Sequence, residues 1–282
     1  MPVNDELGKR MKEYYESIPK TKLMRRTPVV IRLDGKAFHT FTKGFQKPFD
    51  EVLIKSMQET MKYLCKNIQG CVLGYTQSDE ITLILVDYKN LNSDAWFDYE
   101  VQKMCSIAAS MATLVFNRYF SLELDRFQDE NFIAGEWKVE ESVPKAYSRA
   151  YDTGAMFDAR VFNVPKEEVT NLIYWRQLDA IRNSIQMVGQ ANFSHKELQN
   201  KSCNIIQNML LTEKDINWND FPTHQKRGSC CIKEEYYPEP MVGYENCDID
   251  TRTVRTRWIV DTEIPVFKDE GRKYIEKLIN FE

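Results

Sequence analysis

Hydrophobic residues recur every three or four positions in several stretches of the chain, which is the spacing of an α-helix with one buried face. These stretches predict helices at residues 4–18, 51–69, 94–119, 165–188 and 196–211. Apolar runs rich in β-branched residues predict strands instead. They lie at residues 28–33, 71–76, 81–86, 156–164, 229–232 and 253–260. Residues 120–155 are polar and poorly periodic, which predicts an irregular connection.

The first part of the chain follows the order strand, helix, strand, strand, helix, strand. This is the order of the split βαβ, or ferredoxin-like, unit, an α+β fold with an antiparallel sheet. No Gly-, Ser- or Pro-rich linker divides the chain, so we expect a single domain over residues 1–282. The sheet core should span about residues 25–165. Residues 166–282 should form a helical elaboration that includes a basic strand.

This topology brings two acidic turns together. Asp34 ends the first strand, and Asp79 lies in the hairpin between the second and third strands. A helix connects the first two strands, so they run in the same direction, and the third strand is the neighbour of the first. Asp34 and Asp79 should therefore lie side by side at one edge of the sheet. Either turn alone is ordinary turn chemistry, because Asp-Gly and Ser-Asp are common turn sequences.

Two neighbouring carboxylates suit a hard cation. Mg²⁺ prefers oxygen ligands and is typically held by one or two carboxylates together with substrate phosphates. Two such ions about 3.5–4 Å apart can activate an attacking hydroxyl and stabilise the leaving oxygen in a displacement at phosphorus. Gly35 carries no side chain, so a triphosphate can approach the backbone of residues 35–39. Lys36 and Lys47 can add positive charge there.

The overall charge does not indicate a protein coated with positive charge. The formal net charge is −4, so contact with a nucleic acid has to come from local clusters of Lys and Arg. Such clusters occur at residues 20–26, 226–227 and 252–257. Each cluster alone could equally be a solvated surface.

The cysteine and histidine content gives no sign of a zinc site. The chain has 7 cysteines without C-x-x-C spacing and 3 histidines, of which we expect His195 and His224 at the surface. Adjacent Cys230 and Cys231 are typical of strand packing in a reduced protein. The polar N-terminus predicts no signal peptide, and the apolar run at residues 81–86 is too short to span a bilayer. A soluble cytoplasmic protein is the expectation.

Several blocks of sequence are more specific than the pattern alone. Residues 30–39 read VIRLDGKAFH, KPFD follows at 47–50, and residues 75–80 read YTQSDE. Later blocks are FDARV at 157–161, WRQLD at 175–179, NWN at 217–219 and KRG at 226–228. In this order, over about residues 5–235, they resemble the signature blocks of the tRNA-His guanylyltransferase superfamily.

The resemblance implies a polymerase-like palm and a catalytic domain that adds nucleotides to the 5′ end of RNA. It implies that Asp34, the Gly35 carbonyl and Asp79 bind two Mg²⁺ ions, and Glu80 is a further candidate catalytic residue. Asp34, Asp79 and their neighbours would bind the triphosphate: Gly35, Lys36, Ala37, Phe38, His39, Lys47 and Ser78. The family first activates a 5′-monophosphate with ATP. The 3′-hydroxyl of GTP then attacks and releases AMP, and a 5′-triphosphate end can skip the first step.

One departure from the family concerns the choice of tRNA. Eukaryotic members carry H-I-N-N-L-Y after the W-R-Q-x-D block, whereas this chain reads AIRNSI at 180–185. Ile181 replaces the histidine, and Asn183 is kept. This resembles the guanylyltransferase-like branch of bacteria and archaea, which repairs 5′-truncated tRNAs by templated addition. Such repair is our expectation, and addition of one G to tRNA-His is the alternative.

Weaker candidates for contact with RNA or a second nucleotide lie outside the metal site, and those on the predicted helix could equally form a polar face. They are Arg32, Arg176, Gln177, Asp179, Arg182, Asn183, Arg255 and Arg257. A nucleotidyl cyclase is a second hypothesis, but cyclases lack the later blocks. A non-catalytic RNA-binding module is a third, but it has no need for two facing carboxylates. The resemblance also favours a homo-oligomer, because relatives form tetramers.

Overall fold

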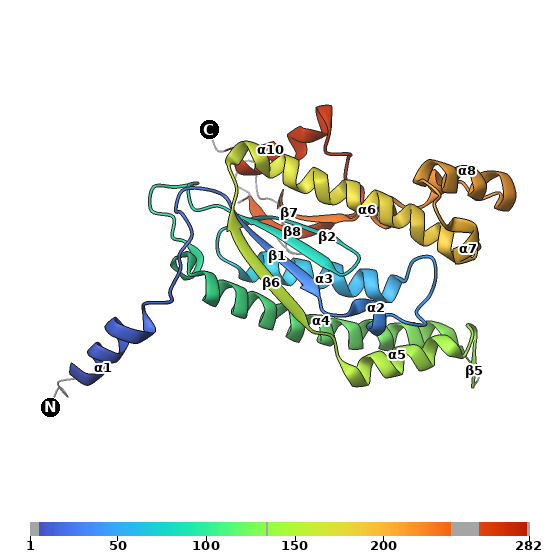
Figure 1. Ribbon diagram of the computed structural model, residues 1–282, viewed down its shortest axis with the longest axis horizontal. Helices are drawn as coiled ribbons and strands as arrows, with labels where there is room; N and C mark the ends of the chain where they lie inside the picture. The colour runs from blue at the N-terminus through green and yellow to red at the C-terminus, as the bar shows by residue number, and fades with distance from the viewer. Residues whose placement is uncertain (1–5, 134, 238–253, 281–282) are drawn as a thin grey trace, which may run out of the picture.

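The sheet of the computed structural model has the predicted ferredoxin-like order. The structure describes residues 6–133, 135–237 and 254–280 (Figure 1). Helix α3 (Glu51–Asn67) connects the first strand to the second, and α4 (Val101–Asn131) connects the third to the fourth. The order β6–β1–β3–β2 is antiparallel throughout and confirms the α+β palm; its strands are β1 (Val29–Gly35), β2 (Cys71–Gln77), β3 (Glu80–Leu85) and β6 (Phe157–Asn163).

Helices cover both faces of the sheet. Helices α3 and α4 lie against one face, and α5 (Ser142–Thr153) packs on α4 (Figure 1). The other face carries α6 (Val169–Asn192) and the short helix α10 (Lys273–Ile279). The far end of α6 packs on α8 in a separate apolar cluster, beside α7; their bounds are His195–Leu198 for α7 and Cys203–Lys214 for α8.

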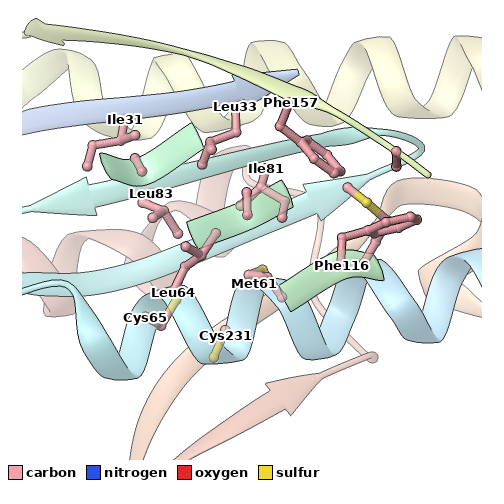
Figure 2. Packing of buried hydrophobic residues seen from close by; sticks show 14 of the residues in the cluster. Ile31, Leu33, Met61, Leu64, Cys65, Ile81, Leu83, Phe116, Phe157 and Cys231 are labelled. Carbon is pink, nitrogen blue, oxygen red and sulfur yellow. The ribbon is translucent and has the colours of Figure 1, made fainter. Parts of the chain in front are cut away.

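The main core lies between the sheet and the α3–α4 layer. Side chains alternate along a strand, so Ile31 and Leu33 of β1 belong to this core while Val30 belongs to the opposite one. Figure 2 shows Ile31 and Leu33 on the side of the sheet that faces Met61 and Leu64 of α3. All five side chains are completely buried. Strand β1 is therefore packed on one face up to Leu33 and on the other face at Val30, near its start.

The C-terminal part of the chain adds strands to the sheet as well as helices. Strand β7 (Ser229–Tyr236) pairs with β2, and β8 (Arg255–Asp261) pairs with β7. The full order is β6–β1–β3–β2–β7–β8. Cys230 and Cys231 are completely buried in β7, which confirms strand packing.

Two helical predictions differ from the structure. Helix α4 starts later than predicted and continues to Asn131, so much of the region expected to be irregular is helical. Its last turns bury few apolar side chains, chiefly Phe120 and Phe127, too few to produce a visible period. A two-stranded hairpin and α5 occupy the rest of that region, with β4 at Phe132–Ile133 and β5 at Glu136–Trp137. The helix predicted at 196–211 is interrupted between α7 and α8.

The predicted N-terminal helix is present but buries nothing. It consists of α1 (Glu6–Met11) and a π-helical turn (Lys12–Glu16), and neither contains a buried residue. Its apolar face, with Leu7 61% and Tyr14 61% exposed, is open. In Figure 1 this segment projects away from the sheet.

Asp50 connects α3 to the loop that precedes it. Its carboxylate accepts hydrogen bonds from the N–H groups of Leu53 and Gln46, both at 2.9 Å, and thereby caps α3. The hydroxyl of Tyr147 on α5 donates to the same carboxylate at 2.7 Å. Burial raises the pKa of Asp50, and these three hydrogen bonds oppose the rise.

Replacing Tyr147 by Phe should reduce the free energy of unfolding by about 1–3 kcal/mol at neutral pH. A raised folded-state pKa means that Asp50 contributes stability at low pH that is lost as the pH rises through that pKa. Tyr147→Phe removes a bond to the ionised form, so its effect should be largest above the folded-state pKa and shrink below it. Urea unfolding at neutral and at acidic pH measures the loss of unfolding free energy at each pH. Tyr151→Phe, at an exposed tyrosine, is the control. A loss independent of pH would contradict this assignment.

Candidate active site

Asp34 and Asp79 meet at one end of the sheet, as the topology predicts. Asp34 lies opposite Glu80 in the pairing of β1 with β3, and the N–H of Gly35 donates to the carbonyl of Asp79 at 3.0 Å. Ser78 has a φ of 55° in the turn between β2 and β3. Strand pairing and one backbone hydrogen bond therefore hold the two carboxyl-bearing residues together.

Acidic and basic residues alternate in rows across this face of the sheet. Directly opposed residues of antiparallel strands share a face, so Asp158, Asp34 and Glu80 form an acidic row across β6, β1 and β3. Two positions back along β1, Arg32 lies opposite Arg160 of β6. The Arg160 guanidinium is 3.6 Å from the carboxylate of Asp158 and 4.0 Å from that of Asp34.

The electrostatics of Asp79 fit a site for a cation. Burial raises the pKa of Asp79, bonds to its own backbone and to Ser78 lower it, and the charges of Asp34 and Glu80 raise it. A hard cation between Asp34 and Asp79 would offset that repulsion, and the side chain of Asp34, 42% exposed, leaves room for water ligands. In the described part of the chain no group of three or more His, Cys, Asp or Glu could hold a metal. A metal here would therefore need substrate oxygens as well.

The backbone after Asp34 turns tightly into the short helix α2 (Phe38–Phe41). A Cβ added to Gly35 would lie 2.3 Å from the ring of Phe38, so only glycine fits here. That ring is buried against Phe116 and Phe157, with centroids at 5.5 and 5.2 Å. Phe38 therefore anchors the turn in the core. The other side chains of the turn are exposed: Lys36, Ala37 and His39.

A cavity of about 410 Å³ opens beside Asp79. Five residues that the sequence predicts for nucleotide binding line it: Phe38, His39, Lys47, Ser78 and Asp79. Its other walls come from the loop before α3, from α6 and from α9 (Thr223–Arg227). Sequence reasoning missed several of these wall residues: Gln46, Met187, Gln190, His224 and Gln225.

His224 is one of the cavity residues that the sequence did not predict. The sequence predicts it at the surface, whereas the structure places it in the wall of the cavity with its side chain 18% exposed. Its ring lies 3.6 Å from the carboxylate of Glu51, to which the Gln225 amide donates at 2.6 Å. The hydrogen bond with His224 is the main cause that lowers the pKa of Glu51. The only signal in the sequence was the position of His224 between the NWN and KRG blocks.

Glu80 is held by two arginines. Arg176 of α6 donates to both carboxylate oxygens at 2.7 Å, and Arg32 donates to one of them at 2.8 Å. The side chains of Arg176 and Glu80 are only 10% and 12% exposed. Arg176 also lies 3.1 Å from Asp179, which lies 3.2 Å from Arg182. This network joins α6 to the sheet beside the acidic row and brings four of the weaker candidates next to the site.

Gln177 faces away from this network. It is completely buried; its amide nitrogen donates to the Pro265 carbonyl at 2.8 Å, and its amide oxygen accepts from the Phe267 N–H at 2.9 Å. Its side chain therefore fastens the segment before α10, and the structure does not bring it to the predicted RNA contact. Asn183, further along α6, is half-buried.

Arg255 and Arg257 also lie away from the site. Strand β7 begins opposite Thr76, at the site end of β2, and β8 pairs Arg257 with Glu234 and Arg255 with Tyr236 towards the other end. Five to seven strand residues correspond to roughly 17–23 Å. Both side chains are exposed, and Arg257 binds Glu234 at 2.8 Å. Arg252, Thr253 and Cys247 lie outside the described residues.

A sequence profile described as tRNAHis guanylyltransferase matches residues 8–165 of the 282-residue chain. The chain belongs to this family. A bacterial tRNA(His) guanylyltransferase-like protein solved in complex with ATP is 40% identical, with a TM-score of 0.77 over 98% of this chain and 100% of that one. A structure of such a protein in complex with GTP is 38% identical. Its TM-score is 0.71 over 98% of this chain and 99% of that one. A protein of Acanthamoeba polyphaga mimivirus is 30% identical over 249 residues, 82% of this chain and 78% of the relative.

Membership in the guanylyltransferase family confirms the resemblance seen in the signature blocks and makes the protein an enzyme, a nucleotidyltransferase. The similarity to bacterial guanylyltransferase-like proteins, at 40% and 38% identity, agrees with the branch indicated by Ile181. No described helix is long and apolar enough to cross a membrane.

Gly35→Ala should lower stability and activity together. The new Cβ would meet the Phe38 ring, so either the ring or the turn that carries Asp34 has to move. Such overpacking costs about 1–3 kcal/mol, and a displacement of about 1 Å in a catalytic group can lower the rate roughly 100-fold. Tm and kcat measure the two effects. Adding Phe38→Leu should restore part of the stability, and strictly additive losses would mean that this contact is not the cause.

Glu80→Ala should destabilise the fold, because it leaves Arg32 and Arg176 without their shared carboxylate. Breaking one side of a buried ion pair costs about 3–5 kcal/mol, and the slight exposure of this pair favours the lower value. The control is Glu234→Ala, whose side chain is 41% exposed in its pair with Arg257 and should contribute about 0–1 kcal/mol. Urea unfolding compares the variants. If the Glu80→Ala and Glu234→Ala variants were equally stable, Glu80 would not anchor α6 to the sheet.

Proposed function

We propose that the protein adds nucleotides to the 5′ end of tRNA in the 3′-to-5′ direction and repairs 5′-truncated tRNAs. The main support is that Asp34 is held next to Asp79, and that Asp79 lines a cavity together with Lys47, Ser78 and His39. A 5′-monophosphate would attack the α-phosphorus of ATP, forming an adenylylated end and releasing pyrophosphate. The 3′-hydroxyl of GTP or another nucleoside triphosphate would then attack the RNA's own 5′-phosphorus, form a phosphodiester bond and release AMP. A 5′-triphosphate end would enter directly and release pyrophosphate.

Asp34, the Gly35 carbonyl and Asp79 would hold two Mg²⁺ ions. When bound, such ions lower the pKa of an attacking hydroxyl and stabilise the charge on the leaving oxygen. The protein contributes the fixed separation of its carboxylates, because strand pairing holds Asp34 and a backbone bond holds Asp79. Glu80 is engaged with arginines, so we assign it the task of orienting them.

The cavity would receive the nucleoside triphosphate that accompanies the metal. Its volume of about 410 Å³ lies in the range of small-ligand pockets. The N–H groups of Gly35 and Lys36 already donate to Asp79 and Met156, so backbone contacts to phosphate fall to residues 37–39. Lys47 and Lys36, both exposed, would supply positive charge.

Templated repair is favoured over strict addition of G to tRNA-His by Ile181, which replaces the histidine of eukaryotic members. The bacterial guanylyltransferase-like structures, at 40% and 38% identity, support the same choice. On the sequence arguments above we further propose a cytoplasmic enzyme that assembles as a homo-oligomer, with a tetramer as the first possibility.

A tRNA lacking its 5′-terminal nucleotide, labelled at the 5′ end, tests this function directly. With Mg²⁺, ATP and each nucleoside triphosphate, we expect growth at the 5′ end that follows the 3′ strand as template. Asp34→Ala and Asp79→Ala should each lower the rate at least 100-fold, and EDTA should abolish it. Full-length tRNA-His in parallel distinguishes the two branches: addition of a single G to that tRNA alone would favour the alternative. Neither extension nor an adenylylated intermediate on any tRNA would overturn the proposal.

A further inference from the structure

Trp175 is a large aromatic side chain exposed next to the acidic row. It is 50% exposed on α6, although an indole of this size is usually well covered. It lies one position before Arg176, which binds Glu80, the residue opposite Asp34. Neither the metal site nor the cavity uses it.

Two guanidinium groups hold the indole in place. Arg176 lies 4.6 Å and Arg32 lies 5.5 Å from the centre of the Trp175 ring, within the range of cation–π contacts. Both arginines are fixed in turn by the Glu80 carboxylate. The ring is therefore oriented before any ligand arrives, while half of its surface stays open.

Two exposed arginines stand on the elements next to this ring, Arg182 in an ion pair with Asp179 and Arg160 beside Asp158 and Asp34. Arg182, 57% exposed, lies seven positions along α6 and so on the same face of the helix. Arg160, 58% exposed, stands on the neighbouring strand β6. An oriented aromatic surface flanked by exposed guanidinium groups is the combination that binds single-stranded nucleic acid, because bases stack on the ring and phosphates pair with the cations.

We propose that Trp175 stacks on an unpaired base of the RNA substrate at the end that reacts. This inference rests on the proposed function, since it takes the ligand to be RNA. Arg160 and Arg182 bind the phosphates that flank this base. Trp175 thus positions the RNA end over Asp34 and is distinct from the cavity that takes the triphosphate.

Two RNA hairpins test the assignment. They share one stem, and one is blunt while the other carries four unpaired 3′ nucleotides. Fluorescence anisotropy at fixed salt, without ATP or Mg²⁺, gives Kd for each. Trp175→Ala should weaken binding of the overhang hairpin about tenfold or more and leave the blunt hairpin within about twofold. Trp175→Phe, which keeps an aromatic face, should retain most of the affinity. In the extension assay Trp175→Ala should raise KM for RNA and leave KM for GTP within about twofold.

The matched control is Tyr151→Ala, since Tyr151 is 56% exposed on α5, in the layer that covers the opposite face of the sheet. Its Kd values should equal those of the unaltered protein. Unchanged overhang binding by Trp175→Ala, or an equal loss on both hairpins, overturns the proposal. If the Trp175→Ala variant does not fold, the test uses Trp175→Phe instead. Loss of overhang binding by a folded Trp175→Phe variant would also contradict the proposal. Selective loss by Trp175→Ala when the unaltered protein extends no RNA would support stacking and refute the 5′-transfer function.

Discussion

The pairing of β1 with β3 is the constraint on which the rest of the site depends. It places Asp34 opposite Glu80, and the next N–H along, that of Gly35, bonds to Asp79. Like charges so close repel each other, and burial of Asp79 strengthens the effect. Completely buried side chains hold β1 in place, on its core face up to Leu33 and on its other face at Val30. The scaffold thus holds the carboxylates together against their mutual repulsion, which a cation bound between them, as we propose, would relieve.

The acids of the acidic row differ in the positive charges that surround them. Glu80 is neutralised by Arg32 and Arg176 and fastens α6 to the sheet. Among the described residues, the cation paired with Asp34 is Arg160, at 4.0 Å. Neighbouring acids in one row therefore differ in their surroundings: Glu80 has two short arginine contacts, whereas Asp34, which we propose as a metal ligand, has a long one.

The sequence predicted the structure correctly where a local pattern of residues determines it. The β-branched runs and the strand–helix order predicted the palm sheet, and the topology then predicted the meeting of Asp34 and Asp79. Prediction failed where the contacts of a residue depend on the direction in which its side chain points. Arg176 and Gln177 are adjacent in the chain but about 100° apart around a helix, so one reaches Glu80 while the other is buried against the C-terminal segment. His224 reaches the cavity only because α9 precedes β7, and β7 pairs with β2, a long-range pairing that no local pattern indicates.

Coupling between the two sides of the site follows from the same contacts. Asp34 is connected to the cavity through the bond between Gly35 and Asp79, and to α6 through Glu80, which lies opposite it. The cavity is walled partly by α6 itself, through Met187 and Gln190. A single helix therefore borders both the cavity and the exposed arginines. Because Arg176 and Glu80 are almost desolvated, that helix cannot shift along the sheet without breaking their bonds. The cavity wall and the exposed arginines of α6 therefore keep a fixed position relative to the carboxylates.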